Sequence, residues 1–219
     1  MEPVEAKRRY DSSRRRAQAE ATRADILEAA QRRFERHGYA ATSMEAVATE
    51  AGVALKTVYV AFGTKSGLLR ALWNHLLRDG RDDTPAARQS RYRAVVEKPD
   101  PERQLRVAFH ASRIVEERIG GVLDVIRGAA QVDPEVAALW SRIQSELHDN
   151  QRVIVESLDR KGALVADIDA ATDVLWTITH PNVWQLLVRE RGWTPDRWER
   201  WSADLACAQL LGSATRPPA

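Results

Sequence analysis

Cysteine is nearly absent from this sequence of 219 residues, where Cys207 is the single example. One thiol cannot form a disulfide within the chain, so the disulfide framework of small secreted domains is excluded. Long apolar runs are also missing. The best stretch, Val174 to Val188, contains His180 and Pro181 and is too polar for a membrane span. The N-terminus is charged and has no apolar segment typical of a secretory signal. We therefore expect a cytoplasmic protein with no membrane contact.

Glycine and proline are sparse, with 11 and 9 residues, and strictly alternating apolar stretches are lacking. Long segments are instead rich in Ala, Leu, Arg, Glu and Gln, which favour helix, so we expect an all-α fold. Signals of catalysis are missing too: the sequence shows neither a Gly-rich phosphate loop nor a nucleophile motif. The five His residues lack the spacing of metal ligands; they are His37, His75, His110, His148 and His180. We predict no metal, no cofactor and no enzyme, and keep a helical enzyme as a remote alternative.

The net charge of +2 is small, but its distribution is uneven. Residues 7–16 contain six Lys or Arg and one Asp, including Arg14, Arg15 and Arg16. A basic N-terminal arm is a candidate for binding DNA phosphates or the minor groove. The alternative is a solvated, disordered leader. Both interpretations hold if the arm is disordered in solution and becomes ordered only on DNA. We therefore predict a disordered basic arm over residues 1–16.

Four helices are predicted in the first third of the chain, over residues 17–37, 44–51, 55–62 and 65–77. Apolar residues recur at helical spacing from Ile26 to Phe34, and Gly38 follows as a stop signal. Thr42 and Glu45 have the spacing of a capping box, and Thr64 is the expected cap of the fourth helix. Residues 80–85 are predicted to be a linker.

Residues 42–65 have the pattern of a helix-turn-helix. Such a motif needs a small residue in its first helix, Gly in the turn, and apolar residues facing inward from the second helix. Ala48, Gly52, Val53 and Val58 meet these requirements. The second helix is too short to be stable alone, so it must be supported by its neighbours, which leaves its outer face free for a major groove.

The predicted DNA-contacting side chains fall into two groups. The outer face of the second helix carries Lys56, Thr57, Tyr59 and Val60. Lys56 suits a guanine edge or a phosphate, and Tyr59 suits a phosphate. Helix starts supply the other group, namely Thr42, Ser43 and Lys65, at positions where a phosphate can be bound. For any one of these residues, a solvated surface side chain is the alternative.

The same region closely resembles the TetR family of bacterial transcriptional regulators. The matching residues are Ile26–Ala30, Phe34, Gly38-Tyr39, Thr42-Ser43-Met44, Ala48, Ala51-Gly52-Val53, Thr57-Val58-Tyr59, Phe62, Lys65 and Leu68-Leu69. The resemblance implies a homodimeric repressor on a near-palindromic double-stranded operator, released by a small-molecule ligand. Ala54 and Ala61 depart from the family pattern, where a Ser cap and an aromatic or His are usual, so the base contacts do not carry over.

The rest of the chain predicts longer helices. Residues 84–97 are left unassigned, and the expected helices cover 101–120, 122–129, 134–161, 169–190 and 195–212. Asp133 is expected to cap the third of these, with Pro134 at its first position. Pro181 is expected to kink the fourth, and either Asp167 or Asp169 to cap it. We predict a DNA-binding domain over 17–79, a ligand-sensing and dimerisation domain over 80–212, and a frayed tail over 213–219. The resemblance places the dimer interface at about 169–190 and 196–212.

Six of the seven Trp residues lie between 140 and 201. The resemblance implies an apolar cavity among the middle helices, and the candidate lining residues are Phe109, Arg113, Trp140, Trp176 and His180. Arg113 in such a cavity would favour an anionic ligand. The alternative is that these aromatics only pack the core or the dimer interface. A ligand-independent architectural DNA-binding protein remains the competing function, and a cavity of ligand size would argue against it.

Overall fold

The computed structural model describes residues 4–78 and 90–212, and every regular element within them is helical. The prediction of an all-α fold is confirmed. Contacts divide the chain into two units, one of Met1–Gly80 with Asp124–Ala137 and the other of Arg81–Leu123 with Ala138–Ala219. This division differs from the expected boundary because residues 124–137 join the N-terminal unit. The linker predicted over 80–85 and the tail predicted over 213–219 lie outside the described residues.

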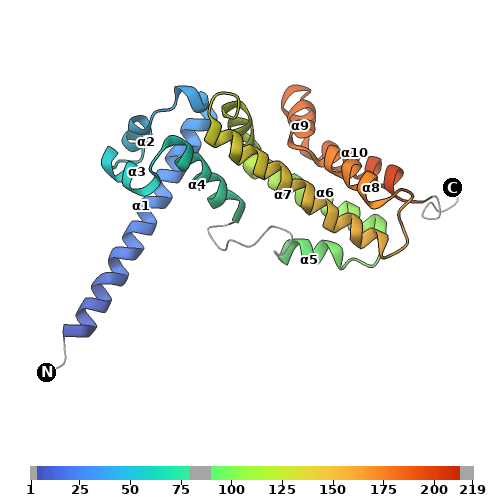
Figure 1. The fold of residues 1–219 in the computed structure, drawn as a ribbon, viewed down its shortest axis with the longest axis horizontal. Coiled ribbons are helices and arrows are strands. Elements are labelled where there is room, and N and C mark those ends of the chain that lie inside the picture. The colour runs from blue at the N-terminus through green and yellow to red at the C-terminus, as the bar shows by residue number, and fades with distance from the viewer. Residues whose placement is uncertain (1–3, 79–89, 213–219) are drawn as a thin grey trace. The chain divides into compact units, whose positions relative to one another are not determined.

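The N-terminal unit is built on four helices (Figure 1): α1 (Val4–Ala41), α2 (Met44–Glu50), α3 (Leu55–Phe62) and α4 (Lys65–Arg78). The predicted apolar face of α1, from Ile26 to Phe34, is buried, and α1 packs on α2 and α4. α4 contributes Leu72 and Trp73 to this core. The four helices therefore close around one apolar centre, with α3 held between α2 and α4.

The first helix begins earlier than expected. The structure starts α1 at Val4, where we predicted a disordered arm up to residue 16. After Pro3 this segment contains only residues that a helix tolerates, and many of them, such as Ala6, Lys7 and Arg8, favour one. A helix already formed from residue 17 can therefore extend backwards at little cost, since propagation is easier than nucleation.

The end of α1 and the start of α2 follow the predicted signals, with one correction. Gly38 interrupts α1 at a φ of 75°, a left-handed conformation that favours glycine. Ser43, not Thr42, caps α2: its hydroxyl oxygen accepts a hydrogen bond from the Ala46 N–H at 3.1 Å. The predicted Thr42–Glu45 capping box is wrong because the Thr42 hydroxyl turns inward and donates to the Gly38 carbonyl at 2.8 Å.

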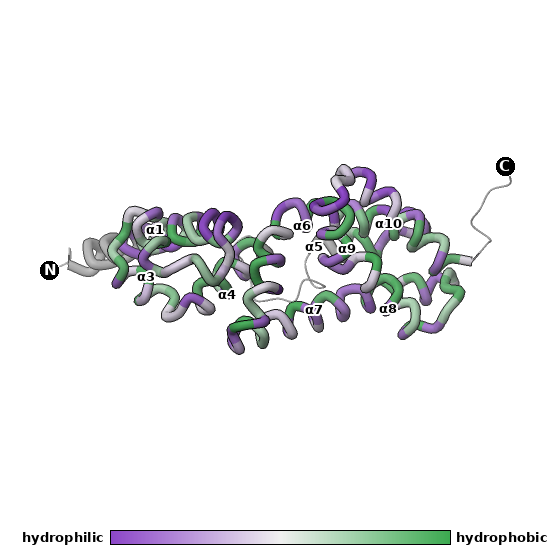
Figure 2. The backbone as a smooth tube through the Cα atoms, turned by 90° about the horizontal axis from the view of Figure 1, so that it is seen from above, coloured by the Kyte–Doolittle hydropathy of each residue, from purple (hydrophilic) through white to green (hydrophobic). Residues whose placement is uncertain are grey.

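The C-terminal unit draws on the remaining elements, which are α5 (Ser90–Val96), α6 (Pro101–Ala129), α7 (Pro134–Asp159), α8 (Ile168–Thr179), α9 (Pro181–Trp184), the π-helical segment η2 (Gln185–Glu190) and α10 (Pro195–Leu210). Figure 2 shows hydrophobic and hydrophilic residues alternating along α7, as expected for a helix with one buried side. Gln104 of α6 is fully buried and its amide donates to the Ile154 carbonyl of α7 at 3.2 Å. Trp198, Leu175 and Leu158 are fully buried in the core of this unit.

Two predicted helix boundaries in this unit are wrong. α6 runs straight through Gly120 and Gly121 instead of ending there. Glycine costs a helix only about 1 kcal/mol, and the apolar stripe continues on both sides with Ile119 and Val122, which are buried. Pro181 does not kink one helix but starts a new one, because His180 before it is extended with a ψ of 136°.

Other predicted caps are confirmed. Asp167 caps α8 by accepting the Ala170 N–H at 2.9 Å, and Thr64 caps α4 by accepting the Gly67 N–H at the same distance. Asp133 caps α7, with Pro134 in its first turn. No helix in the described part of the chain is both long and apolar enough to cross a bilayer.

Candidate nucleic-acid interface and effector cavity

The turn between α2 and α3 has the left-handed backbone conformation that the sequence predicts at its glycine. Gly52 has a φ of 66°. Its N–H donates to the Thr49 carbonyl at 3.2 Å, and the Val53 N–H donates to the Ala48 carbonyl at 3.0 Å. These two bonds are the Schellman pattern that terminates a helix with a left-handed residue. The turn is therefore fixed by its own backbone, and it sets the direction in which α3 leaves.

α3 presents its polar side to solvent. Val58 is fully buried and anchors the helix to the core, whereas Tyr59 is 50% exposed and Val60 is 80% exposed. Lys56 and Thr57 are also exposed. The four side chains predicted on the outer face of α3 thus lie together on one accessible surface of an anchored helix.

Arg23 of α1 supports the far end of α3. Its guanidinium donates to the Ala61 carbonyl at 2.9 Å and lies 4.3 Å from the centre of the Phe62 ring. One side chain thus satisfies a helix-end carbonyl and makes a cation–π contact. Sequence reasoning missed this residue because it lies 38 positions before its partner, and no local pattern connects them.

Glu50, at the end of α2, is tied to α1 by two arginines. Arg32 donates to one of its carboxylate oxygens at 2.8 Å and Arg33 to the other at 2.6 Å. The hydrogen bond from Arg32, with a further bond from Arg33, holds the pKa of Glu50 below its usual value. Together with the Arg23 contact, these pairs fix both helices of the motif to the same support.

The two hydroxyls before α2 differ in what they can reach. Ser43 is exposed, and its oxygen caps the helix while its proton stays available to an acceptor. Thr42 is 2% exposed and its proton is committed to the Gly38 carbonyl. Thr42 is therefore withdrawn from the predicted DNA contacts, since a buried hydroxyl cannot touch a phosphate.

The other predicted cationic contacts lie outside α3: Lys65 starts α4, and the arginines of the basic arm lie on α1. The Lys65 ammonium donates to the Tyr39 carbonyl at 2.8 Å and lies 4.3 Å from the centre of the Tyr39 ring. An ammonium has three donors, so this bond leaves capacity for an acceptor outside. Arg14, Arg15 and Arg16 are all exposed on α1, and Arg16 pairs with Glu20 at 3.2 Å.

The turn between α6 and α7 is bonded to the helix-turn-helix unit. The Tyr39 hydroxyl donates to Asp133 Oδ2 at 2.5 Å, and the Ser66 hydroxyl donates to Glu135 Oε2 at 2.5 Å. Asp133 also caps α7 through its other oxygen. These bonds explain why residues 124–137 belong to the N-terminal unit.

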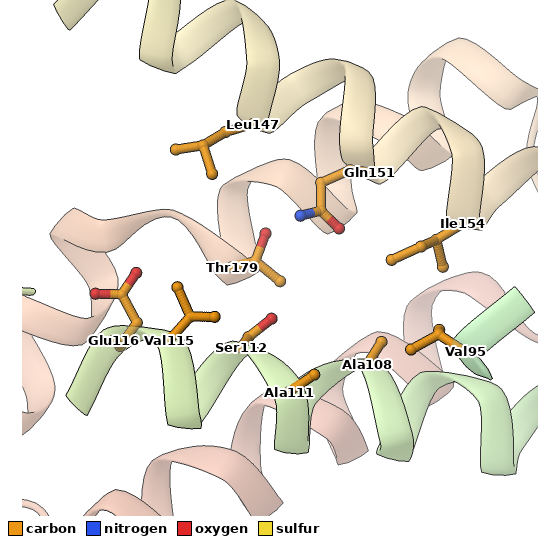
Figure 3. Close-up of a pocket in the computed structure, with 10 residues that line it drawn as sticks. All are labelled: Val95, Ala108, Ala111, Ser112, Val115, Glu116, Leu147, Gln151, Ile154 and Thr179. Carbon is orange, nitrogen blue, oxygen red and sulfur yellow. The ribbon is translucent and has the colours of Figure 1, made fainter. Parts of the chain in front are cut away.

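A cavity lies inside the C-terminal unit (Figure 3). The space between its lining atoms, open mouth included, is about 580 Å³. Its lining residues come from α5, α6, α7 and the end of α8, and they are Val95, Ala108, Ala111, Ser112, Val115, Glu116, Leu147, Gln151, Ile154 and Thr179. The lining is mainly apolar with a few polar side chains, a composition typical of small-molecule sites.

None of the five residues that the sequence suggested for a cavity is among these lining residues. Phe109 is fully buried and packs edge-on against Trp198 at 6.2 Å. Arg113 instead points to α10, where its guanidinium donates to Glu199 at 2.5 Å and lies 3.6 Å from Asp196.

The other three predicted cavity residues, Trp140, Trp176 and His180, form a cluster of their own. The His180 ring lies 4.9 Å from the Trp176 ring and 6.5 Å from the Trp140 ring. His180 Nδ1 accepts the Asn182 N–H at 3.1 Å, so Nε2 is the protonated nitrogen, and it donates to Gln144 at 2.7 Å. This His therefore caps α9 and orients its own ring.

Sequence reasoning missed Glu116 and Gln151, the two buried polar residues of the cavity. A signal existed for Glu116. Leu105, Phe109, Glu116, Ile119 and Leu123 share one helical spacing, and a carboxylate within an apolar stripe marks a polar group turned inward. Across the described ranges 4–78 and 90–212, no group of His, Cys, Asp or Glu is arranged to hold a metal ion.

A glycine turn followed by a short, anchored helix with an exposed outer face is the arrangement of a helix-turn-helix motif, the class of module that binds DNA. The sequence model of the family described as "Bacterial regulatory proteins, tetR family" matches residues 26–72. Together with the relatives below, this match supports a TetR-family transcriptional regulator. It is 26% identical over 163 residues to HTH-type transcriptional regulator TtgR of Pseudomonas putida, which is 72% of this chain and 75% of TtgR.

The fold is shared with solved regulators. NalD, the secondary repressor of the MexAB-OprM multidrug efflux pump in Pseudomonas aeruginosa, superposes with a TM-score of 0.68 at 21% identity, covering 90% of this chain and 99% of NalD. SmeT, in a complex with triclosan, superposes with a TM-score of 0.66 at 18% identity, covering 90% of this chain and 95% of SmeT. At these identities the likeness establishes the fold, and the matched proteins are regulators rather than enzymes.

Proposed function

We propose that this regulator is a homodimeric repressor that leaves a near-palindromic DNA operator when a small molecule binds in its C-terminal unit. The single observation that carries the DNA-binding half is the exposed face of α3 on a helix anchored by Val58. The cavity of about 580 Å³ carries the effector half. Repression is favoured because NalD, which shares the fold, is itself described as a repressor.

α3 is the helix that enters the major groove in this proposal. Lys56 and Tyr59 are exposed on α3, and in this proposal Lys56 meets a base edge or a phosphate and Tyr59 meets a phosphate. Thr57 and Val60 offer a hydroxyl and methyl groups for a thymine or the backbone. Replacing Lys56 with Met should relax sequence preference under α3 if the ammonium reads a base.

Phosphate contacts around α3 come from the exposed Ser43 hydroxyl, from Lys65 and from the basic start of α1. Arg14, Arg15 and Arg16 extend along one exposed helix, which suits a role on the backbone or in the minor groove. These contacts position the domain without reading sequence.

The second copy of the chain is proposed to pack through residues 169–190 and 196–212. Apolar side chains remain accessible there: Leu186 is 53% exposed and Trp201 is 39% exposed. Trp201 also packs edge-on against Trp193 at 5.6 Å, which presents a rigid aromatic surface. Two helical segments per subunit would form a four-helix contact across a two-fold axis.

An effector would act by population shift. Two recognition helices must sit about one DNA turn apart, roughly 34 Å, to occupy successive major grooves. A ligand that binds better to a conformation with another spacing lowers DNA affinity. An architectural protein without an effector is the alternative, and the cavity favours an effector because its mainly apolar lining with a few polar groups is typical of small-molecule sites.

The test starts from the purified full chain. Its mass in solution is measured, and a random double-stranded DNA library is offered for selection and sequencing. We expect a dimer that enriches an inverted repeat. A monomer would contradict the dimer, and recovery of the library without enrichment would contradict sequence-specific binding. Addition of candidate metabolites to the complex with the enriched duplex then tests effector release.

A further inference from the structure

We propose that the cavity in the C-terminal unit binds a small organic cation with an apolar body, and that Glu116 supplies the opposite charge. The inference rests on the proposal that this cavity is an effector site, and it adds the chemical class of the effector. Figure 3 shows Glu116, Ser112 and Gln151 among mainly apolar side chains from α6 and α7.

The charge of the site comes from one residue. Glu116 is 6% exposed and lines the cavity, and among the described lining residues it is the only charged side chain. A carboxylate at this depth acts on a ligand through a lower dielectric than water provides, so its attraction for a cation is strengthened. The same carboxylate repels an anion.

The Glu116 carboxylate lies beside a residue without a side chain. Gly120 follows it by one turn of α6, and a Cβ added there would lie 3.3 Å from Glu116 Oε2 and 3.6 Å from Trp184 Nε1. Glycine thus leaves the room that the carboxylate occupies. The Trp184 ring itself is held by packing edge-on against Trp198 at 5.0 Å.

Two further groups present oxygen acceptors. Gln151 is 6% exposed, and its Oε1 is buried without a hydrogen-bond partner. The Thr179 hydroxyl donates its proton to the Leu175 carbonyl at 2.8 Å, so its oxygen remains available to accept a hydrogen bond. These two acceptors and the Glu116 carboxylate complement a ligand that donates hydrogen bonds, as a protonated amine does.

The remaining wall defines the body of the ligand. Val115, Leu147 and Ile154 are aliphatic, and Ala108 and Ala111 are small enough to leave space beside them. This composition suits a hydrocarbon or aromatic group. The sequence had suggested an anionic ligand through Arg113, but Arg113 is paired with Glu199 and is not part of the lining.

The test compares three probes that share one apolar body: phenylbutylamine, phenylbutanol and phenylbutyrate, which are cationic, neutral and anionic at neutral pH. Calorimetric titration of the full-length protein should give the amine an affinity at least about tenfold above the alcohol, which corresponds to about 1.4 kcal/mol. The carboxylate should bind most weakly. Equal binding of all three, tighter binding of the alcohol or the carboxylate, or binding of none would overturn the proposal.

Two variants then test whether Glu116 supplies the negative charge of the cavity. Glu116→Gln keeps the shape and should lower amine affinity about tenfold while leaving the alcohol unchanged. Glu117→Gln is the matched control, because it removes a carboxylate from the next, exposed position of α6. Unchanged amine affinity in Glu116→Gln, or an equal loss in Glu117→Gln, would overturn the assignment.

Binding of the protein to the duplex library is measured separately, on the same preparations without probe. If the protein enriches no duplex, the proposed function fails whatever the probes do. If it binds DNA but shows no preference for the amine, only the cation inference fails.

Discussion

The Tyr39 hydroxyl donates a hydrogen bond to the carboxylate of Asp133 at 2.5 Å, across 94 positions of sequence. This bond holds the pKa of Asp133 below its usual value, and the backbone N–H groups of Val136 and Glu135 lower it further. Burial, with the same hydrogen bond, raises the pKa of the Tyr39 phenol. The pair therefore connects the cap of α7 to the last turn of α1.

Replacing Tyr39 with Phe removes only the hydroxyl. We expect the free energy of unfolding to fall by about 1–2 kcal/mol, since the acceptor is charged but half exposed. Urea denaturation at pH 7 measures this, and an unchanged midpoint would show that the bond contributes nothing.

The same variant has a predicted pH dependence. Asp133 has a lowered pKa in the folded state, so the stability it contributes is fully present above its unfolded pKa of about 3.9 and is lost as pH falls through the folded value. The difference in stability between the native protein and Tyr39→Phe should be constant from pH 7 to 5 and shrink below about pH 4. A difference that widens on acidification would contradict this assignment.

Replacing Arg23 with Lys should loosen α3 without changing the charge. A lysine ammonium is not planar, so it cannot stack on the Phe62 ring as the guanidinium does. It also cannot reproduce the guanidinium geometry at the Ala61 carbonyl. We expect a stability loss of about 1 kcal/mol and a several-fold weaker affinity for the selected duplex. Arg36→Lys is the matched control, because Arg36 is exposed on the same helix. Equal behaviour of the two variants would exclude a special role for Arg23.

Replacing Tyr59 with Phe tests a neutral phosphate contact. Tyr59 is half exposed, so protein stability should not change, while DNA affinity should fall by a factor corresponding to about 1 kcal/mol. The dependence of binding on salt should keep its slope, because that slope counts cationic contacts. Anisotropy titrations at several salt concentrations measure both, and a changed slope would mean that the variant disturbs the lysines or arginines instead.

Sequence reasoning located the local features of the fold. Gly38 and Gly52 stand where the backbone turns left-handed, and Asp133, Asp167 and Thr64 cap helices as predicted. These features depend on residues within five positions of one another. The exposed face of α3 follows equally from the spacing around Val58.

What sequence reasoning missed depends on contacts between distant segments. Gly120 looked like a helix end, but burial of Ile119 and Val122 keeps α6 continuous. Thr42 is a local exception: its spacing predicted a cap, but its hydroxyl donates to the Gly38 carbonyl four positions earlier. The tryptophans were predicted to line the cavity, but its lining is mostly small and aliphatic. Its buried polar residues, Glu116 and Gln151, lie 35 positions apart on two different helices.

The central claim is that the exposed face of α3 lies against duplex DNA, and two matched valines test it most directly. Val60 on α3 is 80% exposed, and Val132 in the turn between α6 and α7 is 74% exposed. Either can become Glu with little effect on stability, because neither side chain is packed. We predict that Val60→Glu abolishes binding to the selected duplex, since its carboxylate would face phosphates, while Val132→Glu binds as the unsubstituted protein does. Undiminished binding by Val60→Glu would contradict the account.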